Sequence, residues 1–374
     1  MMRNDTRRNR ARSFFVLAAA VGTLGACGDD DATETAATAG QESVPAVTTV
    51  EATDTGSTAD GSGTTAPSTT LAGVEPWIAY TIWGPTDEPQ GVALVHPDGS
   101  DDHEILAELP YPALNPDWSP DGTRLAVQIY SRDSVWIANA DGSESEAVAR
   151  CTAPCEALAD PAWSPSGEQL LITRLDMDPE DGTAPPDQFT SATVEVVDVR
   201  TGERRDVLQS AYPELLRDPS WSPDGSSYAV TVQRFDDDGE QTGSAIAVGG
   251  LDGSPLKVLT PFEQWANQAD WHPQDDILVY ASGDEASNVF TIRADGSDVQ
   301  AVTEFEPGGT RADRPVWTPD GERIIFTAVD DPAEVDQGAP HLTMASIKPD
   351  GTGLERTPLA GRNGYHYTIQ PTTG

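Results

Sequence analysis

Residues 116–130, PDWSPDGTRLAVQIY, form a stretch that returns four more times in the chain. Near-copies of it are PAWSPSGEQLLITRL (161–175), PSWSPDGSSYAVTVQ (219–233), ADWHPQDDILVYAS (269–282) and PVWTPDGERIIFTAV (315–329). Each copy has a short segment ending in Trp, a turn of the Pro-Asp-Gly type, and then alternating apolar residues. Proline sets φ for the first corner of such a turn, glycine takes the position with φ > 0, and period-two alternation is typical of a β-strand. The stretch is therefore interpreted as a repeated β-hairpin.

The tryptophans of the five copies set the period of the repeat. They lie 45, 58, 50 and 46 residues apart, at Trp118, Trp163, Trp221, Trp271 and Trp317. Such a period is typical of repeat architectures, in which one unit cannot bury its apolar faces alone. We therefore expect each tryptophan to pack between neighbouring units rather than to contact a ligand.

A second turn recurs six times, once more than the tryptophan stretch. It is Asp-Gly at 98–99, 141–142, 252–253, 295–296 and 350–351, and Thr-Gly at 201–202. The first unit, residues 76–100, lacks an inner strand, whereas residues 365–374, YHYTIQPTTG, form a strand whose Gln-Pro aligns with the Ser-Pro of the other copies. The sequence predicts an all-β, six-bladed β-propeller with four-stranded antiparallel blades, the first blade being completed by the C-terminal strand. This arrangement leaves only short protected edges.

The Trp-Ser-Pro-Asp-Gly stretch resembles the PD40 (WD40-like) repeat of the TolB-like six-bladed propellers. The resemblance covers residues 74–374, and only the copy at 271–276, WHPQDD, departs from it by lacking the glycine. TolB works in a complex of the cell envelope, so the resemblance implies an envelope scaffold that binds a protein, without naming the partner.

The N-terminal 26 residues have the composition of an export signal. A head with five arginines precedes SFFVLAAAVGTLGA (13–26), whose fourteen residues are too few to cross a hydrocarbon core of about 30 Å as a helix. Leu24 to Cys27, LGAC, resembles the lipobox of bacterial lipoproteins, which implies a lipoprotein signal peptide over 1–26 and lipidation of Cys27. A short membrane anchor that stays in place is the alternative.

Residues 27–73 are rich in Ser, Thr and Ala and have almost no large apolar side chains. Such a segment buries too little surface to offset the entropy of ordering. We therefore expect a lipid-anchored, disordered linker that carries the propeller (74–374) on the extracytoplasmic side of the cell membrane. The predicted localisation is thus exported and membrane-attached through the lipid alone, and we expect a monomer.

Two further cysteines, Cys151 and Cys155, enclose the short loop CTAPC. An even pair in an exported chain favours a disulfide. Metal binding through two thiolates is the alternative, but no further cysteine or nearby histidine completes such a site.

Clustered carboxylates in the loops raise the question of calcium, which oxygen-rich loops bind. The candidate ligands are Asp176, Asp178, Glu180, Asp181, Asp236 and Asp238. Their spacing does not fit an EF-hand, and the alternative is that these loops are simply solvated. Calcium is accordingly the one cofactor that the sequence suggests.

The charge of the chain and its motifs argue against nucleic-acid binding and against an enzyme. With 62 acidic and 22 basic residues and a net charge of −40, the chain repels phosphate backbones. The sequence contains no G-x-S-x-G elbow, no metal-binding histidine spacing and no phosphate loop with lysine. We therefore predict a non-catalytic protein.

Polar residues stand three positions before each tryptophan of the repeat. They are Asn115, Asp160, Asp218, Gln268 and Arg314, with His366 aligned in the C-terminal strand. Inner strands that line the propeller axis would arrange these six side chains as a ring at one mouth of an axial funnel. We predict that this ring binds a protein or peptide partner of the cell envelope. The alternatives are a carbohydrate- or solute-binding or lyase-type propeller using the same funnel, a purely structural spacer, and a ring that is polar only because water fills the funnel.

Overall fold

The computed structural model describes residues 76–84, 88–178, 182, 184–185, 188–284, 286–330, 341–357, 359 and 362–371. All of them belong to one compact unit, Leu71–Gly374. The predicted signal peptide (1–26), the lipidation site Cys27 and the linker (27–73) lie outside the described residues. Within these ranges no helix has the length and apolar character needed to span a membrane.

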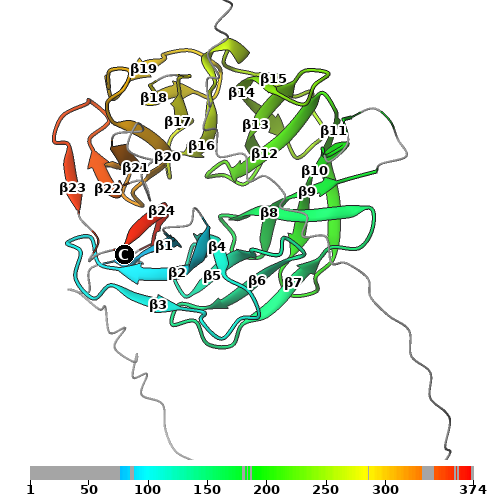
Figure 1. The fold of residues 1–374 in the computed structure, drawn as a ribbon, viewed down its shortest axis with the longest axis horizontal. Helices are drawn as coiled ribbons and strands as arrows, with labels where there is room; N and C mark the ends of the chain where they lie inside the picture. The colour runs from blue at the N-terminus through cyan, green and yellow to red at the C-terminus, as the bar shows by residue number, and fades with distance from the viewer. Residues whose placement is uncertain are drawn as a thin grey trace, which may run out of the picture. The chain divides into compact units, whose positions relative to one another are not determined.

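Six four-stranded antiparallel sheets form the blades of a propeller, as the sequence predicts (Figure 1). Blade 1 contains β24 (Asn363–Ile369), β1 (Ile78–Trp83), β2 (Pro89–Val95) and β3 (His103–Ile105). Blade 2 contains β4 (Ala113–Trp118), β5 (Arg124–Ile129), β6 (Ser134–Asn139) and β7 (Glu146–Arg150). Blade 3 contains β8 (Cys155–Trp163), β9 (Gln169–Asp176), β10 (Ser191–Asp198) and β11 (Arg204–Ala211).

The second half of the ring repeats this order. Blade 4 contains β12 (Glu214–Trp221), β13 (Ser227–Phe235), β14 (Gln241–Gly250) and β15 (Lys257–Val258), followed by the 3₁₀ helix η1 (Phe262–Gln264). Blade 5 contains β16 (Asn267–Trp271), β17 (Ile277–Ser282), β18 (Asn288–Arg293) and β19 (Gln300–Ala301). Blade 6 contains β20 (Arg311–Trp317), β21 (Ile324–Asp330), β22 (His341–Ile347) and β23 (Glu355–Thr357). In each blade the first strand of this order lies nearest the propeller axis (Figure 1).

The C-terminal strand closes the ring, which confirms the predicted closure. β24 pairs antiparallel with β1, from Ile78 opposite Ile369 to Trp83 opposite Asn363. The next residue, Gln370, fastens three parts of the chain. Its backbone N–H donates to the carbonyl of Trp77 at 2.7 Å, its Oε1 accepts the Trp77 N–H at 3.1 Å, and its Nε2 donates to the carbonyl of Gly122 in blade 2 at 2.8 Å.

The core is divided into six clusters, and five of them each contain one repeat tryptophan. Trp118, for example, packs with Ala79 and Val92 of blade 1 and Leu125 of its own blade. The five tryptophans are 4–8% exposed. At the remaining seam Tyr80 and Tyr367 of blade 1 pack with Ile325 of blade 6. The tryptophans therefore join neighbouring blades, as expected from the repeat.

The copy without glycine builds its turn with a histidine. In three of the other four turns the side chain of aspartate accepts the backbone N–H two residues ahead, as Asp121 does from Thr123 at 3.0 Å, and in the fourth turn Ser166 does so from Glu168 at 3.3 Å. In the WHPQDD copy, Nδ1 of His272 accepts the N–H groups of Gln274 at 3.2 Å and Asp275 at 3.0 Å. A side-chain acceptor thus replaces the aspartate, and the hairpin is kept.

Gly122 lies in the turn that Gln370 contacts, and a substitution there tests whether the C-terminal segment is docked. Alanine at Gly122 (φ 68°) would place its Cβ 2.7 Å from the backbone oxygen of Pro371, whereas alanine at Gly253 (φ 82°) would meet nothing within 4 Å. The positive φ costs both variants about 1 kcal/mol, and the clash adds about 1–3 kcal/mol at Gly122 alone. We expect chemical denaturation to show Gly122→Ala as the less stable variant. Equal losses in both variants would contradict a docked C-terminal segment.

Candidate functional site

The axial ring, defined as Asn115, Asp160, Asp218, Gln268, Arg314 and His366, is built by the same backbone irregularity in all six blades. Each residue has a positive φ, between 47° and 56°. In each inner strand the register shifts at this residue, for example between Leu114 and Asp117 opposite β5. Each residue therefore occupies a β-bulge, which bends the strand and re-aims a side chain.

The positive φ values are a cost that all six blades share. A non-glycine residue in the left-handed region loses roughly 1–2 kcal/mol relative to the right-handed one. Such strain persists only where the surroundings fix it, and it gathers at functional sites. Proline follows the ring residue in blades 2, 3, 4 and 6, where the bulge requires no ladder hydrogen bond from that position.

Side chains of the ring hydrogen-bond to one another across blade boundaries. Nδ2 of Asn115 donates to Oδ1 of Asp160 at 3.2 Å. Nη1 of Arg314 lies 3.4 Å from Oδ1 of Asp218 and 3.2 Å from Nδ1 of His366, and that Nδ1 lies 3.1 Å from Oδ1 of Asn115. Gln268 joins the ring by accepting the backbone N–H of Arg314 at 2.9 Å. The structure thus brings all six predicted ring residues together.

His366 is held as a neutral group with a choice of partner. Burial and, next, the charge of Arg314 hold its pKa well below the ordinary value. In a neutral imidazole, Nδ1 of His366 either donates to Asn115 or accepts from Arg314, because one nitrogen cannot do both. The axial ring can therefore exchange the hydrogen bond to Asn115 for the one from Arg314 without changing its charge.

Asp160 is the charged centre of the ring. It is 5% exposed, and its Oδ2 accepts from Nε of Arg217 at 3.0 Å and from the backbone N–H of Asp218 at 3.3 Å. Burial would raise the pKa of Asp160, but the charges of Arg217 and Arg314 outweigh it and lower this pKa. The pKa of Asp218 is raised, because burial and the charge of Asp160 both oppose its ionisation.

Three charged residues beside the ring were not found by counting three positions back from each tryptophan. Arg217 directly precedes the ring residue Asp218, and Asp117 and Asp270 follow the ring positions by two residues. Oδ2 of Asp117 accepts the N–H of Trp163 at 2.7 Å, and Oδ2 of Asp270 accepts that of Trp317 at 2.8 Å. Burial raises the pKa of each to about 7. The sequence signal for the pair is an aspartate immediately before the repeat tryptophan.

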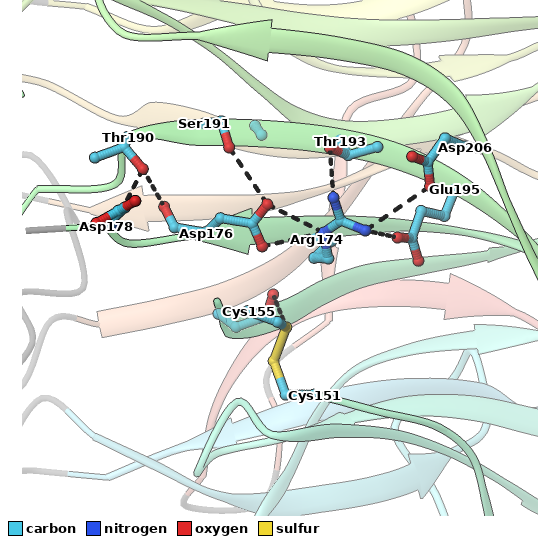
Figure 2. Close-up of polar contacts among 12 residues, drawn as sticks. Cys151, Cys155, Arg174, Asp176, Asp178, Thr190, Ser191, Thr193, Glu195 and Asp206 are labelled. Carbon is cyan, nitrogen blue, oxygen red and sulfur yellow. Dashed lines mark hydrogen bonds and ion pairs between the residues drawn. A yellow bond between two sulfur atoms is a disulfide. The ribbon is translucent and has the colours of Figure 1, made fainter. Parts of the chain in front are cut away.

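Of the predicted calcium ligands that the structure describes, Asp176 is the last residue of β9 and Asp178 follows it, whereas Asp236 and Asp238 lie in the turn between β13 and β14. The carboxylate of Asp176 accepts from Nε of Arg174 at 3.0 Å, and Arg174 also binds the buried Glu195 at 2.6 Å (Figure 2). Oδ1 of Asp236 accepts the N–H groups of Asp238 at 3.0 Å and Glu240 at 2.9 Å.

Asp178 contributes its backbone N–H to Oγ1 of Thr190 at 3.2 Å (Figure 2). Glu180 and Asp181 lie outside the described residues. Among the described residues, no three His, Cys, Asp or Glu side chains gather in a group that could hold a metal ion. Calcium binding stays a prediction.

Cys151 and Cys155 are joined by a disulfide, with their Cα atoms 5.3 Å apart (Figure 2). The bridge lies between the end of β7 and the start of β8. The backbone N–H of Cys151 also donates to the carbonyl of Asp133 at 2.7 Å. The disulfide thus stiffens the crossing from blade 2 to blade 3.

Comparison with known proteins gives sequence relatives that match only in part. No family model matches the chain. The uncharacterized protein Atu1656 of Agrobacterium fabrum is 27% identical over 195 residues, which are 49% of this chain and 59% of that protein. The uncharacterized peptidase YuxL of Bacillus subtilis is 24% identical over 153 residues, 38% of this chain and 23% of that protein. The chain therefore spans less than two thirds of the length of either relative.

Solved structures share the fold. TolB from Acinetobacter baumannii matches with a TM-score of 0.60 and 15% identity over 79% of this chain and 66% of that one. A putative TolB from Agrobacterium tumefaciens matches with a TM-score of 0.53 and 18% identity over 79% of this chain and 97% of that one. An oligogalacturonate lyase from Vibrio parahaemolyticus has a TM-score of 0.50 and 10% identity over 75% and 78%. With its six blades and its C-terminal closing strand, this chain has the fold of a TolB-like β-propeller.

Proposed function

We propose that this protein is a non-catalytic, lipid-anchored exported protein whose axial ring binds a protein or peptide partner of the cell envelope. The observation that carries the proposal is the ring itself, in which six polar side chains occupy strained positions of the same kind. Their mutual hydrogen bonds hold them in place before a ligand arrives. Such preorganisation favours affinity, because fewer side chains have to be ordered on binding.

Partial exposure of side chains at the ring supports ligand binding there. The side chains of Asp218 and Arg314 are each 15% exposed, and that of Arg217 is 29% exposed. Loops in propellers and other scaffolds carry function where the rigid elements position them. The TolB proteins that share the fold add an envelope-scaffold role to the proposal, and the lipobox resemblance adds the anchor.

A second candidate function is a carbohydrate- or solute-binding or lyase-type propeller that uses the same ring. The contact between Arg314 and His366 favours it, because a lyase needs a cation and a base close together. The oligogalacturonate lyase of the same fold is consistent with this candidate. A screen of polyuronides with calcium, read by the absorbance of unsaturated product, would reveal it.

The proposed function is tested by placing a photo-crosslinking amino acid at two positions of the full chain in intact cells. Asn267 directly precedes the ring residue Gln268, whereas Val299, which is 54% exposed, lies at the outer edge of blade 5. We expect a discrete protein adduct from position 267 that position 299 does not give. No adduct, or the same adduct from both positions, would contradict the proposal.

A further inference from the structure

Arginines gather beside the axial ring although the chain as a whole is strongly acidic. The chain has 62 acidic and 22 basic residues. Arg217 and Arg314 bind the two adjacent carboxylates Asp160 and Asp218, at 3.0 Å and 3.4 Å. The carbonyl of Arg132 accepts the N–H of Leu158 at 2.8 Å, two residues before Asp160. The charge of Asp160 also acts on the guanidinium of Arg132, so three arginines, from blades 2, 4 and 6, lie near one pair of carboxylates.

The charges in this cluster act on one another. Burial and, next, the charge of Arg217 lower the pKa of Arg132. Burial also opposes the protonation of Arg217, but the charges of Asp160 and Asp218 outweigh it and raise the pKa of Arg217, and Arg314 reduces that rise. The cluster also faces Glu156, which acts on Arg132. The three arginines face three carboxyl groups, Asp160, Asp218 and Glu156, and burial together with the charge of Asp160 raises the pKa of Asp218. The cluster is thus neutral to positive in a chain with a net charge of −40.

Arg217 has a donor fork that the protein does not use. Its Nε donates to Asp160, but among the described residues its Nη1 and Nη2 have no hydrogen-bond partner. Its side chain is 29% exposed. The hydrogen bond from Nε to Asp160 holds the guanidinium at the ring and leaves the hydrogens of Nη1 and Nη2 available to a second acceptor. A planar fork of this kind matches a carboxylate, which it can bind with two parallel hydrogen bonds.

We propose that the Arg217 fork binds a single carboxylate of the partner, either a C-terminal carboxylate or the side chain of Asp or Glu, with Arg132 and Arg314 adding to the local charge. The proposal rests on the proposed function and names the chemistry of the ligand. A single carboxylate on an otherwise neutral or basic peptide fits the chain, because a net charge of −40 repels a polyanion at long range. A partner of net positive charge would be attracted first and then oriented by the fork.

The test uses the full chain, immobilised, and three libraries of basic hexapeptides. One library has a free C-terminus and no Asp or Glu, the second is amidated and has no Asp or Glu, and the third is amidated with one Glu. We expect retention of the first or the third library to exceed that of the second at least tenfold, which also tells the two sources of the carboxylate apart.

Variants assign the effect to the fork. Arg217→Gln should reduce retention to the level of the second library, and Arg217→Lys should retain an intermediate amount, because charge remains while the fork is lost. Arg293→Gln is the matched control, since Arg293 is 51% exposed and pairs with Asp298 at 3.7 Å at the outer part of blade 5. It should bind like the wild type. Thermal unfolding confirms that each variant is folded.

Each remaining outcome contradicts a defined part of the proposal. Equal retention of all three libraries, unchanged in Arg217→Gln, would overturn the carboxylate site and leave peptide binding intact. No retention of any library would overturn the proposed peptide-binding function as well. Retention of polygalacturonate and of no peptide, dependent on Arg217, would replace the peptide by a polyuronide and overturn the proposal.

Discussion

Replacing Tyr367 by alanine is expected to cost about 3–5 kcal/mol of unfolding free energy, the usual cost of removing a buried aromatic side chain. Tyr367 lies on the closing strand β24 and is fully buried. Its ring lies 5.7 Å from that of Tyr80, centroid to centroid, and its hydroxyl donates to the carbonyl of Gly364 at 2.8 Å. The side chain therefore holds the C-terminal strand against β1 and against the seam with blade 6.

Thermal or denaturant unfolding of the full chain measures this effect. Tyr111→Ala is the matched control, because Tyr111 is 54% exposed and its removal should change stability by no more than about 0.5 kcal/mol. A chain that ends at residue 362 should lose more than Tyr367→Ala, because β1 then has no inner partner. Unchanged unfolding in Tyr367→Ala would mean that the closing strand does not contribute to the ring.

The second large effect is a gain in stability, which Asp117→Asn is expected to show at alkaline pH. Burial raises the pKa of Asp117 from 3.8 to about 7. Below pH 4 the carboxyl is protonated in both states and costs nothing. As the pH rises from 4 to 7 the unfolded chain releases this proton and the native protein keeps it, so the stability of the wild type falls.

Asparagine removes this loss and keeps a carbonyl oxygen for the N–H of Trp163. The stability of Asp117→Asn relative to the wild type should therefore rise by on the order of 2 kcal/mol between pH 4 and pH 8. Urea unfolding across this range measures the difference. The same change at Asp270 should act in the same direction and add less than fully, because the charge of Asp117 contributes to the raised pKa of Asp270.

Asp121→Asn is a control for which the carboxylate has the opposite effect on the free energy of unfolding. The pKa of Asp121 is lowered, because hydrogen bonds from Ser119 and Thr123 outweigh the effect of burial. Its carboxylate therefore stabilises the native state above pH 3.8, and that contribution is lost only as the pH falls below this value. A pH-independent difference between Asp117→Asn and the wild type would contradict a buried, largely protonated Asp117.

The sequence was sufficient for the fold because two of its patterns are redundant. Five tryptophan stretches and six second turns indicate six blades, of which one lacks an inner strand. The C-terminal segment supplies that strand, because its Gln-Pro at 370–371 aligns with the Ser-Pro of the other copies. The structure adds why that segment docks, since Gln370 bonds to both Trp77 and Gly122. The positions of the ring residues could also be predicted, because five of them stand three positions before a repeat tryptophan and His366 aligns with these five.

The sequence pattern does not predict the direction of the side chains next to the bulges of the inner strands. Period-two alternation assumes a regular strand, and the bulge at each ring residue breaks that alternation. For this reason Arg217 at the ring, and Asp117 and Asp270 two residues further on, were missed. The partner of a carboxylate is also set by tertiary packing, so the ion pair between Asp176 and Arg174 could not be read from an acidic loop.

The affinity of the protein captured through position 267 for purified ring variants tests most directly whether the axial ring is the binding site. Arg314→Ala and Asp160→Ala remove two ring members, and Ser297→Ala removes an exposed hydroxyl in the turn after β18. We predict at least tenfold weaker binding for both ring variants and unchanged binding for Ser297→Ala, with all three folded. Wild-type affinity in both ring variants would contradict a binding role for the ring.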